Sequence, residues 1–439
     1  MPGGSDGLPD AQKGKTLENE KAVLVGIDLT DDFTQLCYYT EESELFSASL
    51  SKDPAKFRIP TELCAFSGGN DWLFGEEAAS YAPLPGQNEE FRRINGLVSL
   101  ACSNGTIEIF GQTYAADILL ERFFRRMFAA FKAKFSVAKI TGVVFTVKSI
   151  DENLKRNLTS AVELLGIRSD RIRMITHLES FMYYSVSQNK DIWINDVGLF
   201  DFDHDEFVFY KLSFGRRSEP ITVVAEKTDL TSKVNYKMLA PEETDRLMFA
   251  FENTASAVLN KQIISGLYFT GAGFESAWAD NILKNLCNGR RVFRGQNLYV
   301  KGAGYAADLL LNGGAQNYLL VGDRVLKSSI AIRALSGGSY QEKELVSIGQ
   351  LCDEAACEIE VIMDKTNELD FIVHNALKKD FICAIVTLET LNVRPDRSVR
   401  LNIRLRFPDR DTCVITVRDM GFGEIYRSNH KIWEQVLKI

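Results

Sequence analysis

The sequence contains no apolar run that approaches the roughly 20 residues needed by a membrane-spanning helix. It has only 4 histidines, and its 8 cysteines are scattered over 439 residues, so their spacing fits neither a zinc site nor a disulfide framework. Its 51 basic residues are outnumbered by 59 acidic residues, and the net charge of −8 differs from the basic surplus typical of nucleic-acid-binding proteins. These absences favour a reduced, cytoplasmic protein that binds neither nucleic acid nor a membrane.

The composition itself is typical of a globular protein. Apolar residues make up 45% of the chain and charged residues 25%, and 439 residues correspond to about three domain-sized units. Residues 1–20 are the exception, because they are rich in glycine, proline, lysine and glutamate and show no apolar periodicity. We expect this segment to be a disordered tail. It also lacks the basic and apolar regions of a secretory signal.

After this tail, strand-like and helix-like segments alternate. Residues 23–29 (VLVGIDL) form a short apolar run with Asp28 near its end, as expected for a strand buried on both faces. Residues 118–131 place their apolar side chains on one side of a helix. Residues 142–147 predict another buried strand, and a helix over residues 150–165 follows it and ends at a glycine. The alternation predicts an α/β fold.

The same order of elements recurs in the second half of the chain. Residues 190–212 again indicate a strand, an aspartate, a turn and a strand, with Asp196 in the place of Asp28. Residues 265–287 then indicate a strand, a turn and a helix, as residues 142–165 do. An internal repeat of this kind predicts two similar α/β lobes. The alternative is coincidence within an ordinary α/β protein.

The C-terminal part has a different pattern. Residues 399–407 alternate strictly, with apolar side chains on one face and polar side chains, three of them arginine, on the other. Residues 412–418 predict a partner strand, and a short helix is expected near residues 431–437. The region therefore predicts an antiparallel β-domain. The expected organisation is a tail over residues 1–20, a first lobe over 21–188, a second lobe over 189–315 and a β-domain over 316–439.

Eight segments together carry a resemblance to a known superfamily. In chain order they are residues 26–32 (GIDLTDD), 58–66, 73–79, 107–120, 175–180 (ITHLES), 195–198 (NDVG), 269–273 (FTGAG) and 301–307 (KGAGYAA). They resemble the superfamily of actin, sugar kinases and heat-shock-protein-70 chaperones, and within it the heat-shock chaperone branch. The resemblance implies a two-lobed ATPase fold of duplicated ribonuclease-H-like lobes, followed by a C-terminal β-sandwich-like domain.

The resemblance also implies an ATP or ADP site with Mg²⁺. Asp28 and Asp196 match the carboxylates that hold the cation, and Glu179 matches the carboxylate that orients the attacking water. The residues expected to bind the nucleotide are Thr30, Asp31, Gly198, Gly271, Gly273 and Gly302. Each residue type also has a structural explanation. An aspartate at a strand end is often a turn or cap residue, a helix glutamate can be exposed, and paired glycines can shape a turn without a ligand.

The expected phosphate loops depart from the pattern of the superfamily. Thr30, Asp31 and Asp32 stand where that pattern has Gly-Thr-Thr, and a Cβ at the first position hinders a close approach of phosphate. Each added carboxylate about 4 Å from a phosphate costs roughly 4 kcal/mol at an effective dielectric near 20, unless a cation bridges the charges. The second loop has the bulky Leu199 and Phe200 after its glycine, which suggests a filled or altered phosphate pocket.

Three functions agree with these features. The first is a nucleotide-binding protein in which the nucleotide sets the angle between the lobes, and thereby the surface that the β-domain offers to a protein partner. The second is a pseudo-ATPase, an interaction scaffold that binds no nucleotide. The third is a filament-forming, actin-like structural protein. No lysine clearly matches the catalytic lysine of the superfamily, and Arg92 is the nearest candidate, so we expect weak or absent hydrolysis.

Overall fold

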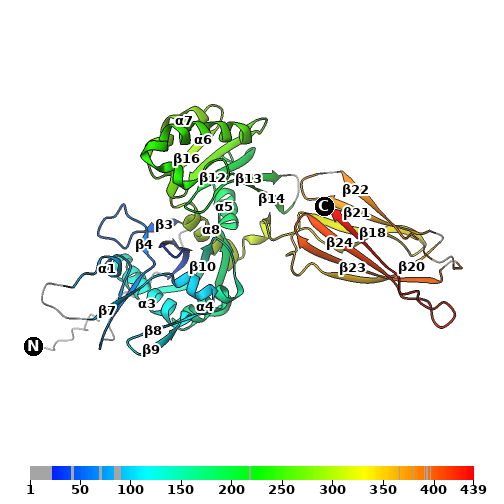
Figure 1. Cartoon of the computed structure of the whole chain (residues 1–439), viewed down its shortest axis with the longest axis horizontal. Helices are drawn as coiled ribbons and strands as arrows, with labels where there is room; N and C mark the ends of the chain where they lie inside the picture. The colour runs from blue at the N-terminus through cyan, green and yellow to red at the C-terminus, as the bar shows by residue number, and fades with distance from the viewer. Residues whose placement is uncertain are drawn as a thin grey trace, which may run out of the picture. The chain divides into compact units, whose positions relative to one another are not determined.

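The computed structural model of the chain describes residues 22–40, 44–68, 72–83, 90–216, 219–364, 366–378, 380–389, 391, 394–395 and 397–439 (Figure 1). The tail expected over residues 1–20 lies outside this part of the chain. The chain forms two compact units: Met1–Phe145 with Asp151–Met174, and Thr146–Ile150 with Ile175–Ile439. No helix among the described residues is long and apolar enough to cross a membrane.

The first unit is built around a sheet with the strand order β11-β10-β1-β2-β3, and β4 pairs with β2. The strands of this sheet are β1 (Ala22–Leu29), β2 (Phe33–Thr40), β3 (Leu45–Ala48), β4 (Ile59–Pro60), β10 (Lys139–Val147) and β11 (Ile172–Thr176). Two smaller sheets contain β5 (Leu63–Phe66), β6 (Leu73–Phe74), β7 (Phe91–Ile94), β8 (Thr106–Ile109) and β9 (Gln112–Ala115). The helices are α1 (Gly75–Ser80), α2 (Leu97–Cys102), α3 (Ala116–Phe135) and α4 (Glu152–Glu163).

Sequence patterns account for the central elements of this sheet. β1 is buried along its length except at its first residue, as its apolar run predicts. α3 directs Phe124 and Phe131 towards the sheet, where their rings meet Phe145 of β10 and Tyr38 of β2. α4 begins where Asp151 accepts hydrogen bonds from the first N–H groups of the helix. The expected pattern of strands and helices is confirmed in this part of the chain.

The second unit contains a sheet with the strand order β16-β15-β12-β13-β14-β17. Its strands are β12 (Asp196–Phe202), β13 (Phe207–Gly215), β14 (Ile221–Asp229), β15 (Ile264–Thr270), β16 (Arg291–Arg294) and β17 (Tyr318–Val321), and its helices are α5 (His177–Val186), α6 (Thr244–Leu259), α7 (Asp280–Leu286) and α8 (Leu298–Asn312). One face of this sheet shares an apolar core with α6 and α7, and the other with α5 and α8 (Figure 1).

The main paths of the two sheets have the same strand order. We number the strands of each sheet by their order along the chain. Across the sheet the spatial order is then third, second, first, fourth, fifth, both in β3-β2-β1-β10-β11 and in β14-β13-β12-β15-β16. In both sheets a helix connects the fourth strand to the fifth, and another helix follows the fifth. The internal repeat is therefore confirmed at the level of strand order. β17 is an addition to the second sheet, since it pairs in parallel with β14.

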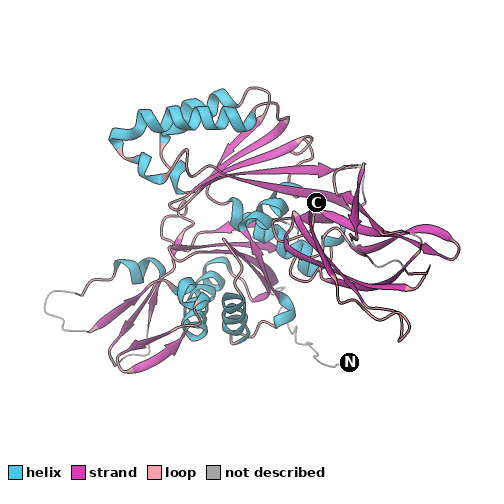
Figure 2. Ribbon diagram, turned by 45° about the vertical axis from the view of Figure 1, so that its right-hand side comes forward, coloured by secondary structure: helices cyan, strands magenta, loops and turns pink. Residues whose placement is uncertain are grey.

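Beyond residue 325, the described residues form strands and no helix (Figure 2). Two four-stranded antiparallel sheets, β19-β18-β21-β22 and β20-β23-β24-β25, enclose one apolar core. The strands are β18 (Ser328–Ser336), β19 (Ser339–Val346), β20 (Cys357–Met363), β21 (Glu368–Asn375), β22 (Phe381–Thr387), β23 (Val399–Asp409), β24 (Thr412–Asp419) and β25 (Ile432–Lys438). The all-β character of the C-terminal region is confirmed.

The helix expected near residues 431–437 is wrong. These residues form β25, which pairs with β24 so that Trp433 lies opposite Val417 and Leu437 opposite Cys413. Trp433 and Leu437 both pack against the core of the β-domain. Two apolar residues four positions apart fit one face of a helix as well as one face of a strand, and the pairing with β24 selects the strand.

The alternation of β23 confirms the strand expected over residues 399–407. Every second side chain from Val399 to Phe407 is buried, and the arginines lie on the opposite face. Arg400 lies 3.7 Å from Glu360, and Arg406 lies 3.9 Å from Glu434. Exposed pairs of this kind stabilise a fold by less than about 1 kcal/mol. This face is therefore a solvated, charge-balanced surface.

Candidate functional site

The first hairpin places Asp28 near the end of β1. The residue is 2% exposed and lies opposite Gln35 of β2. The turn that follows is closed by Thr30, whose N–H and hydroxyl donate to the carbonyl oxygen of Phe33 at 3.0 and 2.9 Å. The Thr30 hydroxyl also accepts a hydrogen bond from the N–H of Phe33 at 3.1 Å. Thr30, expected to bind nucleotide, thus shapes the turn with its own side chain.

Asp31 binds the N-terminus of α2. Its Oδ1 accepts hydrogen bonds from the N–H groups of Val98 and Ser99 at 2.7 and 3.1 Å, and its Oδ2 accepts one from the Ser99 hydroxyl. The first N–H groups of a helix have no partner within the helix and favour a negative group. Asp31, which was also expected to bind nucleotide, satisfies these donors within the chain.

The second hairpin corrects the alignment of the repeat. Asp196 is the first residue of β12, and residues 190–195, expected to be a strand, form turns and a bend. The turn between β12 and β13 begins after Phe202. In the first hairpin the last residue pair before the turn is Leu29 with Thr34, and Asp28 directly precedes Leu29. In the second hairpin the last pair is Phe202 with Phe207, and Asp201 directly precedes Phe202. The structural counterpart of Asp28 is therefore Asp201, five residues further along the chain than Asp196.

Packing explains this register. Leu199 and Phe200 are fully buried and belong to the cores on opposite faces of β12. A Cβ on Gly198 would lie 2.8 Å from a methyl group of Leu267 and 2.9 Å from the ring of Phe209, so the glycine permits close packing inside the sheet. The expectation of a loop here, with Leu199 and Phe200 in a phosphate pocket, is wrong because the segment is the centre of a strand.

Asp201 lies at the centre of a polar cluster contributed by three elements. Tyr299 of α8 donates its hydroxyl to Asp201 Oδ2 at 2.5 Å. The imidazole of His177, at the start of α5, stacks on the Tyr299 ring with centroids 4.2 Å apart. Burial raises the pKa of Asp201 to about 6, although the Tyr299 hydrogen bond and the charge of His177 act in the opposite direction. A carboxyl group that titrates near neutral pH can accept or donate a proton.

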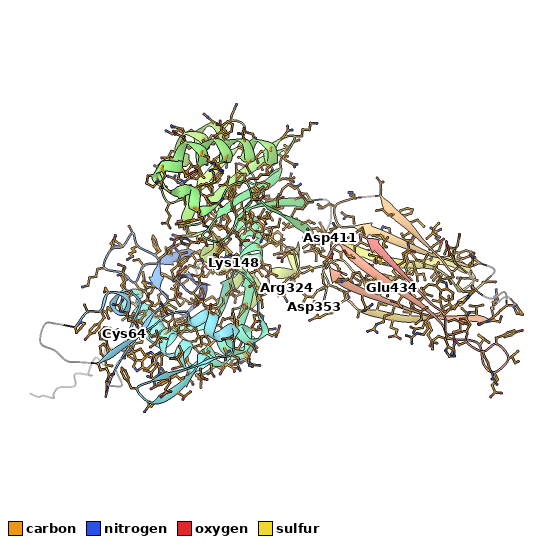
Figure 3. The ribbon with its side chains drawn as sticks, viewed as in Figure 1. Cys64, Lys148, Arg324, Asp353, Asp411 and Glu434 are labelled. Atoms are coloured by element: carbon orange, nitrogen blue, oxygen red, sulfur yellow. The ribbon has the colours of Figure 1, made fainter. Side chains whose placement is uncertain are left out.

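The turn after Asp201 is acidic and is held by a lysine from a distant segment. Lys148, labelled in Figure 3, lies 3.2 Å from Glu206 and 3.7 Å from Asp205. Burial would lower the pKa of Lys148, but the charges of Glu206, Asp205 and Asp203 outweigh it and raise the pKa. The turn contains no glycine. A phosphate group at this turn would meet carboxylates instead of the backbone N–H groups of a glycine-rich loop. A polyanion here therefore needs a bridging cation.

The remaining glycines expected to bind nucleotide are positions of close packing within the chain. A Cβ on Gly271 would lie 2.3 Å from the carbonyl oxygen of Phe202, and one on Gly273 would lie 2.2 Å from the Phe202 ring. A Cβ on Gly302 would lie 2.0 Å from the carbonyl oxygen of Ser180, between α8 and α5. Contacts inside the chain therefore account for glycine at these positions, which is the structural alternative that the sequence left open.

Glu179 forms a capping box with Thr176 at the start of α5. Glu179 Oε2 accepts hydrogen bonds from the N–H and the hydroxyl of Thr176 at 2.7 and 3.1 Å, and Thr176 Oγ1 accepts one from the N–H of Glu179 at 3.1 Å. Burial raises the pKa of Glu179 despite these hydrogen bonds. The side chain also adjoins Gly322, where a Cβ would lie 3.8 Å from Glu179 Cγ. Glu179 is thus a half-buried cap next to the segment that leads to the β-domain.

The described residues contain no group of three or more histidine, cysteine, aspartate or glutamate side chains that could hold a metal ion. Asp28 belongs to the first unit and Asp196 to the second. Burial raises the pKa of Asp196 and so disfavours the charged form that would hold a cation. An Mg²⁺ site formed by Asp28 and Asp196 stays a prediction.

Two cavities lie elsewhere in the second unit. One, of about 500 Å³, is lined by residues between Ser232 and Ala250, and the other, of about 1000 Å³, lies in the β-domain between β18, β19, β20 and β21. None of the residues expected to bind nucleotide lines either cavity. Arg92, the nearest candidate for a catalytic cation, is exposed on β7.

Sequence reasoning missed Asp201, His177, Tyr299 and Lys148. The signal for Asp201 was present, because residues 203–206 (DHDE) separate two apolar runs and so indicate the hairpin turn. The other three residues come from segments far apart along the chain, and only the fold brings them to Asp201 and its turn.

Comparison with known families gives two matches. Residues 325–439 match a domain of unknown function (DUF8552), which covers the β-domain. Residues 44–323, more than half of the chain, match the C-terminal region of a family of unknown function (DUF5716). No curated protein matches the chain significantly. The chain therefore belongs to the DUF5716 family.

Proposed function

We propose that this chain is a nucleotide-binding protein of the actin and heat-shock-protein-70 kind, which binds ATP or ADP with Mg²⁺ and hydrolyses it weakly or not at all. The duplicated strand order carries the proposal. Each sheet has an aspartate one residue pair before its first hairpin turn, Asp28 in one and Asp201 in the other. Two such sheets are expected of the duplicated ribonuclease-H-like lobes of that superfamily.

Three local features support weak hydrolysis. Asp31 is engaged with α2, Glu179 is engaged in the capping box of α5, and the turn after Asp201 is acidic. The group best suited to move a proton is Asp201, because its pKa lies near neutrality and Tyr299 holds it in place. Lys148, the lysine next to the turn after Asp201, is paired with Glu206 and is therefore not free to act as a catalytic lysine.

A route for coupling to a protein partner runs through the segment between β17 and β18. Glu179 adjoins Gly322, and Arg410, in the turn between β23 and β24, donates to the carbonyl oxygen of Gly322 at 2.7 Å. Lys327 forms an ion pair with Asp411 in the same turn; Asp411 is labelled with Arg324 in Figure 3. A displacement at the start of α5 would therefore reach the β-domain through direct contacts.

All eight cysteines are free thiols, which supports a reducing, cytoplasmic setting as part of this proposal.

Thermal unfolding of the full chain with Mg·ATP or Mg·ADP tests the proposal. A ligand at 100 times its Kd adds about 2.7 kcal/mol of stability, so millimolar nucleotide should raise the Tm by several degrees. Asp201→Asn serves as a matched variant, because the amide oxygen of asparagine can still accept the hydrogen bond from the Tyr299 hydroxyl. The variant should keep the Tm shift and lose any residual hydrolysis. An unchanged Tm with both nucleotides would refute nucleotide binding.

A pseudo-ATPase scaffold is the second candidate. The observation that favours it is the engagement of Asp31 and the packing of Gly271 and Gly302 against the chain itself. A scaffold of this kind would bind its protein partner equally well with and without nucleotide.

A further inference from the structure

Among the described strands of the β-domain, four lie at sheet edges: β19 and β22 in one sheet, β20 and β25 in the other. Three of them carry charged side chains, which are Glu342, Lys343 and Glu344 in β19, Glu358 and Glu360 in β20, and Glu434 and Lys438 in β25. β22 (FICAIVT) carries none. Charged residues protect an edge strand from pairing with another strand, so β22 is the unprotected edge of this domain.

β22 is also apolar where it is exposed. Phe381, Ile382 and Ile385 are 52%, 59% and 50% exposed, and the thiol of Cys383 is exposed. Ala384 packs in the domain core, and β22 pairs only with β21 within the described chain. The strand is therefore held in a fixed, extended conformation with one row of backbone groups directed away from its sheet. A strand in this state is suited to bind another strand through its backbone.

We propose that β22 pairs antiparallel with β22 of a second copy of this chain, across a two-fold axis near Ala384, and so joins the sheets of two copies. In an interface with two-fold symmetry, each of the two copies contributes the same surface. An uncharged strand meets no like charge in this arrangement, whereas β19 or β20 would place its own acidic residues opposite one another.

The antiparallel direction is favoured because antiparallel strand pairs are slightly more stable per residue than parallel pairs. A two-fold axis perpendicular to the sheet at Ala384 generates this direction. In the antiparallel pair Cys383 lies opposite Ile385, on the same face of the joined sheet.

Sedimentation velocity of the full chain over the micromolar range tests the proposal. The wild-type chain should form dimers, and Ile385→Lys should raise the dimer Kd about tenfold or more, since the interface would then contain two lysines as diagonal neighbours across the axis. Tyr340→Lys is the matched control, because Tyr340 is a 73% exposed aromatic residue on the edge strand β19. This control should leave the Kd unchanged, and thermal unfolding checks that both variants are folded.

Cross-linking through Cys383 tests the register. The two Cys383 residues would lie diagonally across the axis with Cα atoms about 7–8 Å apart, which a short bismaleimide spans. Cys287 is the other exposed cysteine, so the experiment uses Cys287→Ser as background. We expect a cross-linked dimer in this background and none after addition of Ile385→Lys. A chain that is monomeric at every concentration, or a dimer that persists in Ile385→Lys, would overturn the proposal.

Discussion

Asp201 and Asp28 hold the same position in two hairpins, and their neighbours give them different surroundings. Burial is the main cause that raises the pKa of Asp201, and the charges of Asp203 and Glu206 add to it. The hydroxyl of Tyr299 acts against this rise because it donates to the charged form of the carboxylate. One tyrosine on α8 thus limits how far the proton affinity of a β12 carboxyl increases.

The raised pKa predicts a pH dependence of stability. The ordinary pKa of an aspartate is 3.8, which we take for Asp201 in the unfolded chain, and the pKa of Asp201 in the folded chain is about 6. The folded state therefore holds the proton more tightly than the unfolded state. The stability that Asp201 contributes is fully present below pH 3.8 and is lost as the pH rises through about 6. The total loss in the free energy of unfolding is at most about 3 kcal/mol. The free energy of urea unfolding, measured between pH 4 and 7, should fall for the wild type and fall less for Asp201→Asn.

Tyr299→Phe serves as the comparison. Loss of the hydrogen bond should move the decline in stability to higher pH, because the pKa of Asp201 would rise further. Equal slopes in the wild type and Asp201→Asn would contradict the raised pKa.

At the scale of elements, the close contact between α5 and α8 sets where the cluster residues lie. His177 begins α5, Tyr299 lies in the first turn of α8, and Ser180 and Gly302 meet between the helices. The hydroxyl of Ser180 also donates to the carbonyl oxygen of Tyr299 at 2.5 Å. A larger separation of the helices would therefore disturb both the stack of His177 on Tyr299 and the hydrogen bond to Asp201.

Gly302→Ala should destabilise the chain by about 3 kcal/mol, because the new Cβ meets a backbone carbonyl that can yield only if the helices separate. The net cost includes the better helix propensity of alanine. Gly295→Ala is the matched control, since a Cβ there has no neighbour within 4 Å, and its effect should stay within about 0.5 kcal/mol. Urea unfolding of the two variants measures the difference. Equal stabilities would show that the close approach of α5 and α8 is wrong.

At the scale of the whole molecule, the second sheet and the β-domain are joined by more than the chain itself. Val224, Val321 and Val325 form a small apolar cluster with Ile348 and Ala376 packed against it. Arg410 adds the hydrogen bond to Gly322, and its side chain is largely buried. These contacts link the β-domain to β14 and β17 of the sheet, so we expect the two parts to unfold together.

Arg410→Ala should weaken this link by about 1–2 kcal/mol, since a buried carbonyl loses its donor. Scanning calorimetry should then resolve separate unfolding of the β-domain where the wild type shows one transition. Arg404→Ala, at an exposed position of β23, is the control and should leave the profile unchanged. Unfolding of Arg410→Ala in a single unshifted transition would argue against the coupling route through Gly322.

Predictions from sequence succeeded where a pattern is local. The apolar run of β1, the amphipathic α3 and the strict alternation of β23 each reflect one chain segment against one core. The predictions failed where the pattern of a segment is compatible with two different secondary structures. Residues 190–195 resemble a strand but form turns, and residues 431–437 resemble a helix but form β25. Residues 190–195 lie before the first residue of β12 that pairs with β15, and residues 432–438 pair with β24. Strand pairing therefore decides where these strands begin and end, and no local pattern contains that information.

Sequence alone was sufficient for the mixed α/β character, the repeat and the C-terminal β-domain, because burial periodicity is written into successive residues. It was not sufficient for the site. The expected glycines Gly271, Gly273 and Gly302 pack against Phe202 and Ser180. The residues around Asp201 and its turn come from two helices, which supply Tyr299 and His177, and from the bend after β10, which supplies Lys148. Electrostatic and hydrogen-bonding interactions depend on distances in space, and those distances exist only once the sheets and helices have packed.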